Sequence, residues 1–286
     1  MGAFSILNNI AGLNSQNQLN MNSVSLSRTL LRLSSGKRIN SGADDAAGLQ
    51  IADSLRANTK ALDQAVRNAN DGIGVAQIAD GALQEMSNLL TRAITLAEES
   101  ATETTDDNGR TALNNEFTQI EAEIARIVKQ TNFNGVSIFD TAGTNLGGAL
   151  NVFVGDTANV SSIAVTIATV TTSGDTVTGG MFSLTAVDLQ TAGAAATSLG
   201  TLKTALGNVS QARSGIGSGI NRLQAAAAVL QIQSQNTQAA ESIIRDANIA
   251  EEVANLTKYQ ILAQSGISAL AQANSQSQSV LALLRQ

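Results

Sequence analysis

The segment LRLSSGKRINSGADDAAGLQIA, residues 31–52, gathers the side chains most able to do chemistry: glycines, a Lys–Arg pair and an Asp–Asp pair. Its SSGKR stretch resembles the loop that cradles nucleotide phosphates. That loop needs a glycine five residues before Gly36 and a serine or threonine after Lys37. Leu31 and Arg38 occupy those two positions. The segment therefore favours a structural joint over a nucleotide site.

Two further segments fail similar tests. The GIGSG run at 215–219 has Ile220 where a dinucleotide-binding fingerprint needs its last glycine. The DDNG turn resembles an EF-hand calcium loop, in which glycine takes the sixth position. With Gly109 there, Asn115 falls at the twelfth position, which requires a bidentate glutamate. Neither segment predicts a cofactor or a metal ion.

Adjacent acidic pairs occur at Asp44–Asp45, Glu98–Glu99 and Glu251–Glu252. Neighbours on a helix point about 100° apart, so they cannot share a proton as a catalytic dyad does. The first pair instead precedes a helix that we expect to begin near Ala46, where a carboxylate cap contributes roughly 0.5–2 kcal/mol. Because the chain also has no Cys and no His, we expect no enzymatic activity and no cofactor.

The composition is typical of long helices. The 286 residues include no proline, which breaks helix interiors, and only 2% are aromatic. The net charge is -6, so nucleic acid is not an expected partner. No apolar run approaches the ~20 residues of a membrane span, so no membrane partner is expected either. The start MGAFSILNNIAGLNSQ lacks the basic residues of a cleaved secretory signal.

Hydrophobic periodicity predicts the elements. Apolar residues at alternating steps of three and four predict long, antiparallel, coiled-coil-like helices over 45–99, 110–130 and 195–245. Between 132 and 190 the period changes to two, which predicts β-hairpins. This alternation is clearest at Leu150, Val152, Val154, Ile163, Val165 and Ile167. The expected fold is mainly α, with a rod domain over 46–245 that carries a small β-hairpin insert.

The two ends of the chain have apolar helical spacing but almost no charge. Residues 1–27 carry no charged side chain, and residues 259–286 carry only Arg285. Because exposed helices are usually solubilised by charge, we expect the apolar seam to face a partner helix and the amide-rich face to meet further copies. Residues 1–45 and 246–286 should be disordered in the monomer and helical after assembly. The expected core assembly residues are Ile6, Ile10, Leu13, Val24, Leu31, Leu256, Ile267, Leu270, Leu281 and Leu284.

Four motifs, in order along the chain, resemble those of bacterial flagellins, the subunits of the flagellar filament. They are LRLSSGKRINSGADDAAGLQIADSLRA at 31–57, NANDGIGVAQIADGAL at 68–83, QTNFNG at 130–135 and LAQANSQSQSVLALLRQ at 270–286. The resemblance implies a self-assembling structural subunit whose terminal helices pair and line the channel of a hollow tube. It also implies that the large variable outer domain of longer relatives is absent.

The resemblance assigns the segment 34–45 to the joint between the inner tube and the outer rod. The expected joint residues are Gly36, Lys37, Arg38, Asn40, Gly42, Asp44 and Asp45. It further implies export to the outside of the cell through the flagellar type III apparatus, without cleavage of a signal peptide. The implied partners are other subunits, the filament cap and hook-filament junction proteins, and an export chaperone bound to the C-terminal segment.

Toll-like receptors recognise many flagellins on the rod, which implies a host receptor as a further partner. Aligning LTRAITLA at 90–97 with the recognised stretch places Arg92 and Leu96 at matching positions. Glu116 matches a third position in the next helix.

Three alternatives stay open at this point. A hook-filament junction protein or a minor flagellin has the same kinds of ends. A secreted effector or enzyme would need a reactive constellation, which we do not find. A free coiled-coil binding module would leave two uncharged termini unexplained.

Overall fold

The computed structural model describes residues 9–139, 148–155, 161–167, 169–173, 176–181, 183–184 and 187–284. The chain divides into two compact units: residues 1–57 with 236–286 form unit 1, and residues 58–235 form unit 2. The dividing points lie inside two long helices, α2 (Ala46–Ala101) and α4 (Ala192–Arg245). The sequence-based division at 45 and 246 lies at the ends of those helices instead.

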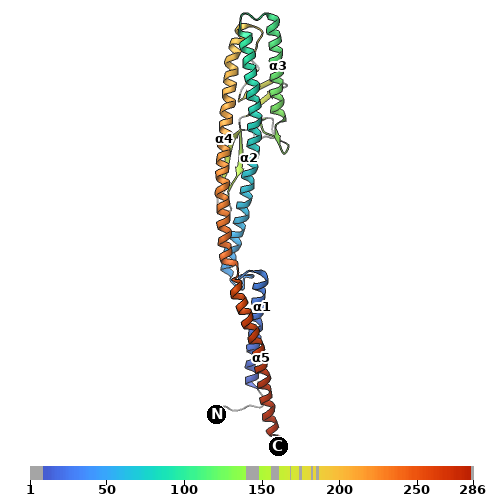
Figure 1. Cartoon of the computed structure of the whole chain (residues 1–286), viewed down its shortest axis with the longest axis vertical. Helices are drawn as coiled ribbons and strands as arrows, with labels where there is room; N and C mark the ends of the chain where they lie inside the picture. Colours follow the sequence, from blue (N-terminus) through green and yellow to red (C-terminus); the bar gives the residue numbers. More distant parts are fainter. Residues whose placement is uncertain are drawn as a thin grey trace. The chain divides into compact units, whose positions relative to one another are not determined.

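Unit 1 is built around two antiparallel helices, α1 (Ile10–Ser35) and α5 (Ile249–Leu284), which lie side by side (Figure 1). The α1 helix begins after Asn9, whose side-chain oxygen accepts a hydrogen bond from the amide of Gly12 at 2.9 Å. It ends at Gly36, which has a φ of 69°. This left-handed conformation closes helix C-termini and is adopted without strain only by glycine.

Unit 2 contains most of α2 and α4 together with α3 (Asp107–Gln130), and these helices lie alongside one another (Figure 1). Asp106 caps α3 by accepting a hydrogen bond from the amide of Gly109 at 2.9 Å. Arg213 of α4 forms an ion pair with Asp80 of α2 at 2.9 Å. The core between the helices is aliphatic, as the near absence of aromatic residues requires. Its fully buried members include Leu62, Leu83, Met86, Leu90, Ile124, Leu202, Val209, Ile216 and Leu223.

The described residues between α3 and α4 in the sequence form three antiparallel hairpins. The first joins β1 (Asn132–Phe133) to β2 (Val136–Ser137) through a two-residue turn, in which Asn134 and Gly135 have φ values of 51° and 78°. Asn-Gly is the favoured sequence for such a turn. The second pairs β3 (Gly148–Phe153) with β4 (Ser162–Ile167). The third pairs β5 (Val170–Ser173) with β6 (Thr176–Gly180).

Two helical glycines leave room for valine side chains of the second hairpin. A Cβ built on Gly72 of α2 would stand 2.5 Å from Val152 Cγ2, and one on Gly219 of α4 would stand 2.6 Å from Val165 Cγ1. Both distances are shorter than any packed side chain tolerates. Gly219 closes the GIGSG run, so the run belongs to a helix and one of its glycines packs a strand.

The predicted helices over 45–99, 110–130 and 195–245 are confirmed by α2, α3 and α4 to within three residues at each end. The period-two segments are confirmed as strands, with Leu150 opposite Val165 and Val152 opposite Ile163. The mainly α class with a hairpin insert is thus confirmed. Periodicity sufficed here because each element buries one continuous face.

Candidate assembly interface and joint

The joint after α1 is tied to the link between α4 and α5, and all of these residues belong to unit 1. The amide of Arg38 donates to the carbonyl oxygen of Arg245 at 2.7 Å. The amide of Ala247 donates to the carbonyl oxygen of Gly36 at 3.0 Å. The left-handed turn at Gly36 therefore places the chain where it can pair with a segment far away in the sequence.

The two basic residues of the joint contact backbone at the link. Lys37 forms an antiparallel bridge with Asp246 through its main chain. Arg38 extends to α4, where its Nη2 donates to the carbonyl oxygen of Ile244 at 2.8 Å. Arg38 thus satisfies a carbonyl in the last turn of α4, where a cation is favourable to the helix dipole.

Arg245 is a joint residue that sequence reasoning missed. Its guanidinium Nη1 lies 3.1 Å from Asp53 Oδ1 and 3.9 Å from Glu241 Oε1, and its side chain is only 12% exposed. It thereby links the end of α4 to the first turns of α2 within unit 1. The one sequence signal for a role at the joint was its position as the last residue of the predicted helix over 195–245.

The two aspartates of the joint do different work. Asp44 Oδ2 accepts hydrogen bonds from the amide and hydroxyl of Ser41, both at 3.0 Å, and from the amide of Asn40 at 3.2 Å. These bonds, led by the one from the Ser41 amide, hold the pKa of Asp44 below its usual value. Asp45 Oδ1 accepts from the amide of Gly48 at 2.9 Å and caps α2. We expected a carboxylate of this pair to cap the helix, and Asp45 does so.

The remaining joint residues differ in how much contact they make with their surroundings. Asn40 donates from Nδ2 to the hydroxyl of Ser35 at 2.8 Å and so fastens the joint to the end of α1. Gly42 has no atom within 4 Å of its built Cβ and no positive φ, so it is not required by its geometry. Ile39, which we did not predict, is buried at 1% exposure, and its Cδ1 would lie 2.8 Å from a Cβ on Gly48. Burial of a lone isoleucine in a polar segment leaves no periodic signal.

Most of the less exposed side chains of α1 and α5 follow a heptad pattern, which we call the pairing seam; Ser25, Arg32 and Asn255 flank it. On α1 the seam residues are Gly12, Ser15, Leu19, Asn22, Leu26, Thr29 and Leu33. On α5 they are Glu252, Leu256, Tyr259, Ala263, Gly266, Leu270 and Ala273. Steps of three and four along both helices are the signature of coiled-coil packing. On α1, the leucines of the seam (Leu19, Leu26 and Leu33) alternate with small or polar residues.

Large apolar side chains of α1 lie on the opposite side, which we call the outer face. Ile10, Leu13, Val24 and Leu31 are between 53% and 63% exposed. Our expectation that this seam faces the partner helix is wrong for these four residues. The pattern misled us because the true seam mixes leucines with glycine, serine, asparagine and threonine, which do not register as hydrophobic.

The α5 residues of the expected interface divide between the two surfaces. Leu256 and Leu270 lie in the pairing seam and are half-buried. Ile267 is 54% exposed and lies outside the pairing seam, on the side that we call the outer face of α5. Ile6 lies outside the described residues. The α5 backbone extends to Leu284, but the side-chain surroundings of Leu281 and Leu284 are not among those described.

The residues aligned with receptor recognition are in unit 2. Arg92 donates from Nε and Nη2 to Glu116 Oε1, at 2.8 and 2.7 Å, and joins α2 to α3 on an exposed surface. Leu96 is 1% exposed and lies in the hydrophobic core. The expectation of a receptor contact through Leu96 is therefore wrong, because the helix turns this side chain inward.

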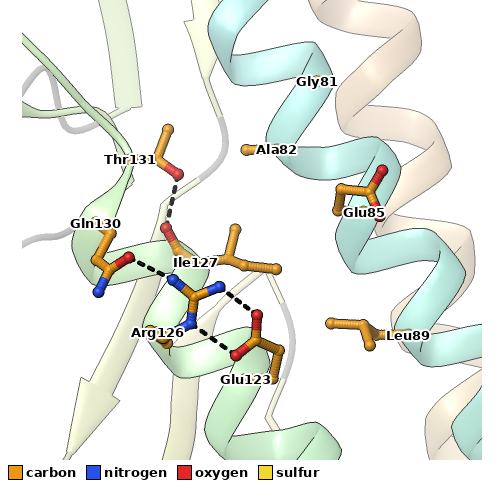
Figure 2. Close-up of a pocket in the computed structure, with 9 residues that line it drawn as sticks. All are labelled: Gly81, Ala82, Glu85, Leu89, Glu123, Arg126, Ile127, Gln130 and Thr131. Carbon is orange, nitrogen blue, oxygen red and sulfur yellow. Dashed lines mark hydrogen bonds and ion pairs between the residues drawn. The ribbon is translucent and has the colours of Figure 1, made fainter.

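A cavity of about 410 Å³ lies between α2 and the end of α3 (Figure 2). Its one cationic group, Arg126, is bound on its own helix by Glu123 and Gln130. The bond to Arg126 lowers the pKa of Glu123 and raises that of Arg126. Since the guanidinium is already occupied by side-chain oxygens, it is not directed at a ligand.

The described residues form neither a membrane-spanning helix nor a cluster of metal ligands. In the described part of the chain, none of the helices combines the length and apolar character that a membrane crossing requires. Within the same ranges, His, Cys, Asp and Glu side chains do not gather in groups of three that could hold a metal ion.

Comparison with known proteins decides the family. Residues 6–144 match the bacterial flagellin N-terminal helical region, and residues 199–284 match the bacterial flagellin C-terminal helical region. The chain belongs to the bacterial flagellin family. Flagellins are structural proteins, and this chain is a structural subunit of the flagellar filament, located outside the cell as part of a polymer of flagellin subunits.

Similar flagellins span its whole length. The chain is 35% identical to flagellin FlaB1 of Treponema pallidum over 287 residues, which cover 98% of this chain and 99% of that protein. It is 36% identical over 280 residues to a flagellin of Halalkalibacterium halodurans, with the same coverage. The crystal structure of Bacillus cereus flagellin matches 61% of this chain and 94% of that one, with a TM-score of 0.50 and 28% identity. These matches favour a filament subunit over a hook-filament junction protein.

Proposed function

We propose that this flagellin builds a hollow helical tube by burying the outer faces of α1 and α5 between copies. The observation that supports this is the exposure of large aliphatic side chains on the terminal helices, such as Ile10 at 63% and Ile267 at 54%. Burying one such side chain contributes about 1.5–3 kcal/mol. Several such side chains per copy add to the burial within the α1–α5 pair and help to offset the entropy of ordering the ends.

The two ends are disordered before assembly in this proposal. An α1–α5 pair on its own buries a seam in which leucines alternate with small or polar residues, and it leaves many of its large apolar residues in water, which favours the unfolded state of both segments. Neighbouring copies then supply the missing apolar burial. Residues 1–45 and 246–286 become the inner tube and residues 46–245 the outer rod, without a large outer domain.

Export and assembly follow from the same properties. A chain whose ends fold only on assembly can pass unfolded through the flagellar type III apparatus without losing a cleaved signal. The export chaperone binds the C-terminal segment and covers apolar residues of α5 such as Ile261 and Leu262, which are 60% and 46% exposed. The filament cap protein and the hook-filament junction proteins complete the set of partners. No catalytic activity is part of this function.

A host Toll-like receptor is a further partner in the proposal, through Arg92 and Glu116. Their side chains are 56% and 45% exposed, so both are accessible on the surface of unit 2. Recognition there requires the receptor to compete with their mutual ion pair.

The experiment that tests the tube is a deletion of residues 1–30. The shortened protein should form no filaments under conditions in which the full chain polymerises. Its α2–α4 core should still give a cooperative thermal transition by circular dichroism. Filaments of normal length from the deletion variant would contradict the proposal.

A further inference from the structure

The α1 helix carries two stripes of side chains, and hydrophobicity alone does not decide which one faces α5. The outer face presents Ile10, Leu13, Val24 and Leu31, which are large and apolar. The pairing seam has a leucine in each of three heptads and presents Gly12, Asn22 and Thr29 as its most buried members. An apolar stripe normally drives helix pairing, but here both stripes carry large apolar side chains. Another interaction is needed to select the pairing seam.

Cross-helix polar contacts provide that selection. Asn22 is 8% exposed, and its Nδ2 donates to the carbonyl oxygen of Tyr259 at 3.0 Å. One heptad and a half further along, Arg32 Nη1 lies 3.4 Å from Oε1 of Glu252, which is 6% exposed. Both contacts exist only when the pairing seam faces α5.

These contacts are poor sources of stability. Among the described residues, Asn22 Oδ1, Arg32 Nε and Glu252 Oε2 are buried without a hydrogen-bond partner. Buried polar groups that are only partly satisfied cost free energy relative to apolar side chains of the same size. In coiled coils, a buried asparagine is retained because it specifies the arrangement of helices at a cost in stability.

We propose that Asn22, together with the Arg32–Glu252 pair, determines which face of α1 lies against α5. These are positioning residues: they keep the pairing seam against α5, so that the outer face stays available to neighbouring copies. The inference rests on the proposed function, because the outer face matters only in the filament. It assigns to polar residues a role in orientation and to apolar residues the role in cohesion.

The chain contains no cysteine, so engineered pairs can report the orientation directly. In the native arrangement a Cβ on Gly266 would lie 3.9 Å from Leu19 Cβ, which suits a disulfide. Leu19→Cys with Gly266→Cys therefore reports the native face. Residue 21 lies about 200° around the helix from residue 19 but only about 3 Å along it. Met21→Cys with Gly266→Cys reports the reversed face.

The test compares these two pairs in filaments grown from a small fraction of the cysteine variant in excess cysteine-free protein, so that bonds between copies are rare. Asn22→Leu is added to each pair, with and without Glu252→Leu. Thr29→Val is the matched control, since it also replaces a buried polar seam residue by an apolar one of the same size. Thr29 is 4% exposed.

We expect Asn22→Leu to raise the ratio of reversed to native disulfide by roughly two- to tenfold, the range that one net hydrogen bond specifies. Adding Glu252→Leu should raise it further, and Thr29→Val should leave it unchanged. Exclusion of Asn22→Leu from filaments that accept Thr29→Val would also support the inference, because a leucine in the seam does not weaken pairing.

Native disulfide alone in every variant, or an equal rise with Thr29→Val, would overturn the inference and leave the proposed function intact. In that case the backbone bridge at the joint sets the orientation by itself. Failure of the cysteine-free protein to form filaments would contradict the proposed function instead.

Discussion

Val152 of the second hairpin packs directly against Gly72 of α2, so closely that a methyl group on Gly72 would stand 2.5 Å from Val152 Cγ2. We expect Gly72→Ala to destabilise unit 2 by about 1–3 kcal/mol, the usual range for overpacking a core. Urea denaturation of the monomer, followed by circular dichroism, measures this change.

Gly74 and Val152 provide the controls for that substitution. A Cβ on Gly74 would meet no atom within 4 Å, so Gly74→Ala should stabilise the helix by up to about 1 kcal/mol. Val152→Ala should remove most of the penalty when combined with Gly72→Ala, as a double-mutant cycle reveals. Equal effects of the two glycine substitutions would show that the hairpin does not need Gly72.

The joint makes unequal demands on its two glycines. Gly36 has a φ of 69°, so Gly36→Ala forces an L-residue into a left-handed conformation at a cost of roughly 1–2 kcal/mol. Gly42→Ala meets neither strain nor a neighbouring atom and should change stability by less than about 0.5 kcal/mol. The temperature at which filaments dissociate should fall for Gly36→Ala only. A comparable fall for both variants would mean that general flexibility of the joint matters more than the turn.

Asp44 gives the joint a defined response to acid. The folded state lowers its pKa, so its contribution to stability is complete above the unfolded value of about 3.9 and is lost as pH falls through the lower folded value. Asp44→Asn should therefore lower the dissociation temperature of filaments at pH 7, and the difference from the unchanged protein should shrink below about pH 4. Ser41→Ala, which removes one donor to Asp44, should show a smaller effect with the same pH dependence. A difference that stays constant down to pH 3 would assign the effect to something other than the charge of Asp44.

Arg92 separates receptor recognition from folding. Its ion pair with Glu116 is solvent-exposed, and such pairs contribute about 0–1 kcal/mol, so Arg92→Ala should leave the monomer folded. A cell-based assay of Toll-like receptor activation should nevertheless show a reduced response. Arg67→Ala, at another exposed position of α2, is the matched control. A full response to Arg92→Ala would remove this residue from the recognition surface.

Much of the fold could be predicted because the long helices repeat one pattern over many turns. The apolar steps of α2 and α4 and the alternation in β3 and β4 each report a single buried face. The close contacts of Gly72 and Gly219 with the second hairpin could not be predicted, because they depend on strands that come from elsewhere in the sequence. Glycine inside a helix does not by itself report a close contact, since Gly74 of α2 has no atom within 4 Å of its Cβ position.

The candidate interface was predicted less well, for a physical reason. The pairing seam of α1 combines leucines with small residues and with polar contacts from Asn22 and Arg32, whereas a hydrophobicity pattern detects only the apolar residues. Leu96 was misplaced because alignment to a motif does not report which way a helix turns. Ile39 and Arg245 are single residues that do not belong to a repeating pattern, so hydrophobic periodicity could not identify them.

The central claim is that the outer faces of α1 and α5 are buried between copies and that the ends fold only then. Amide hydrogen exchange of residues 10–35, compared between monomer and filament, tests it most directly. The account predicts rapid exchange in the monomer and strong protection in the filament, with no comparable change in the core of unit 2. Equal protection of this segment in both states would contradict it.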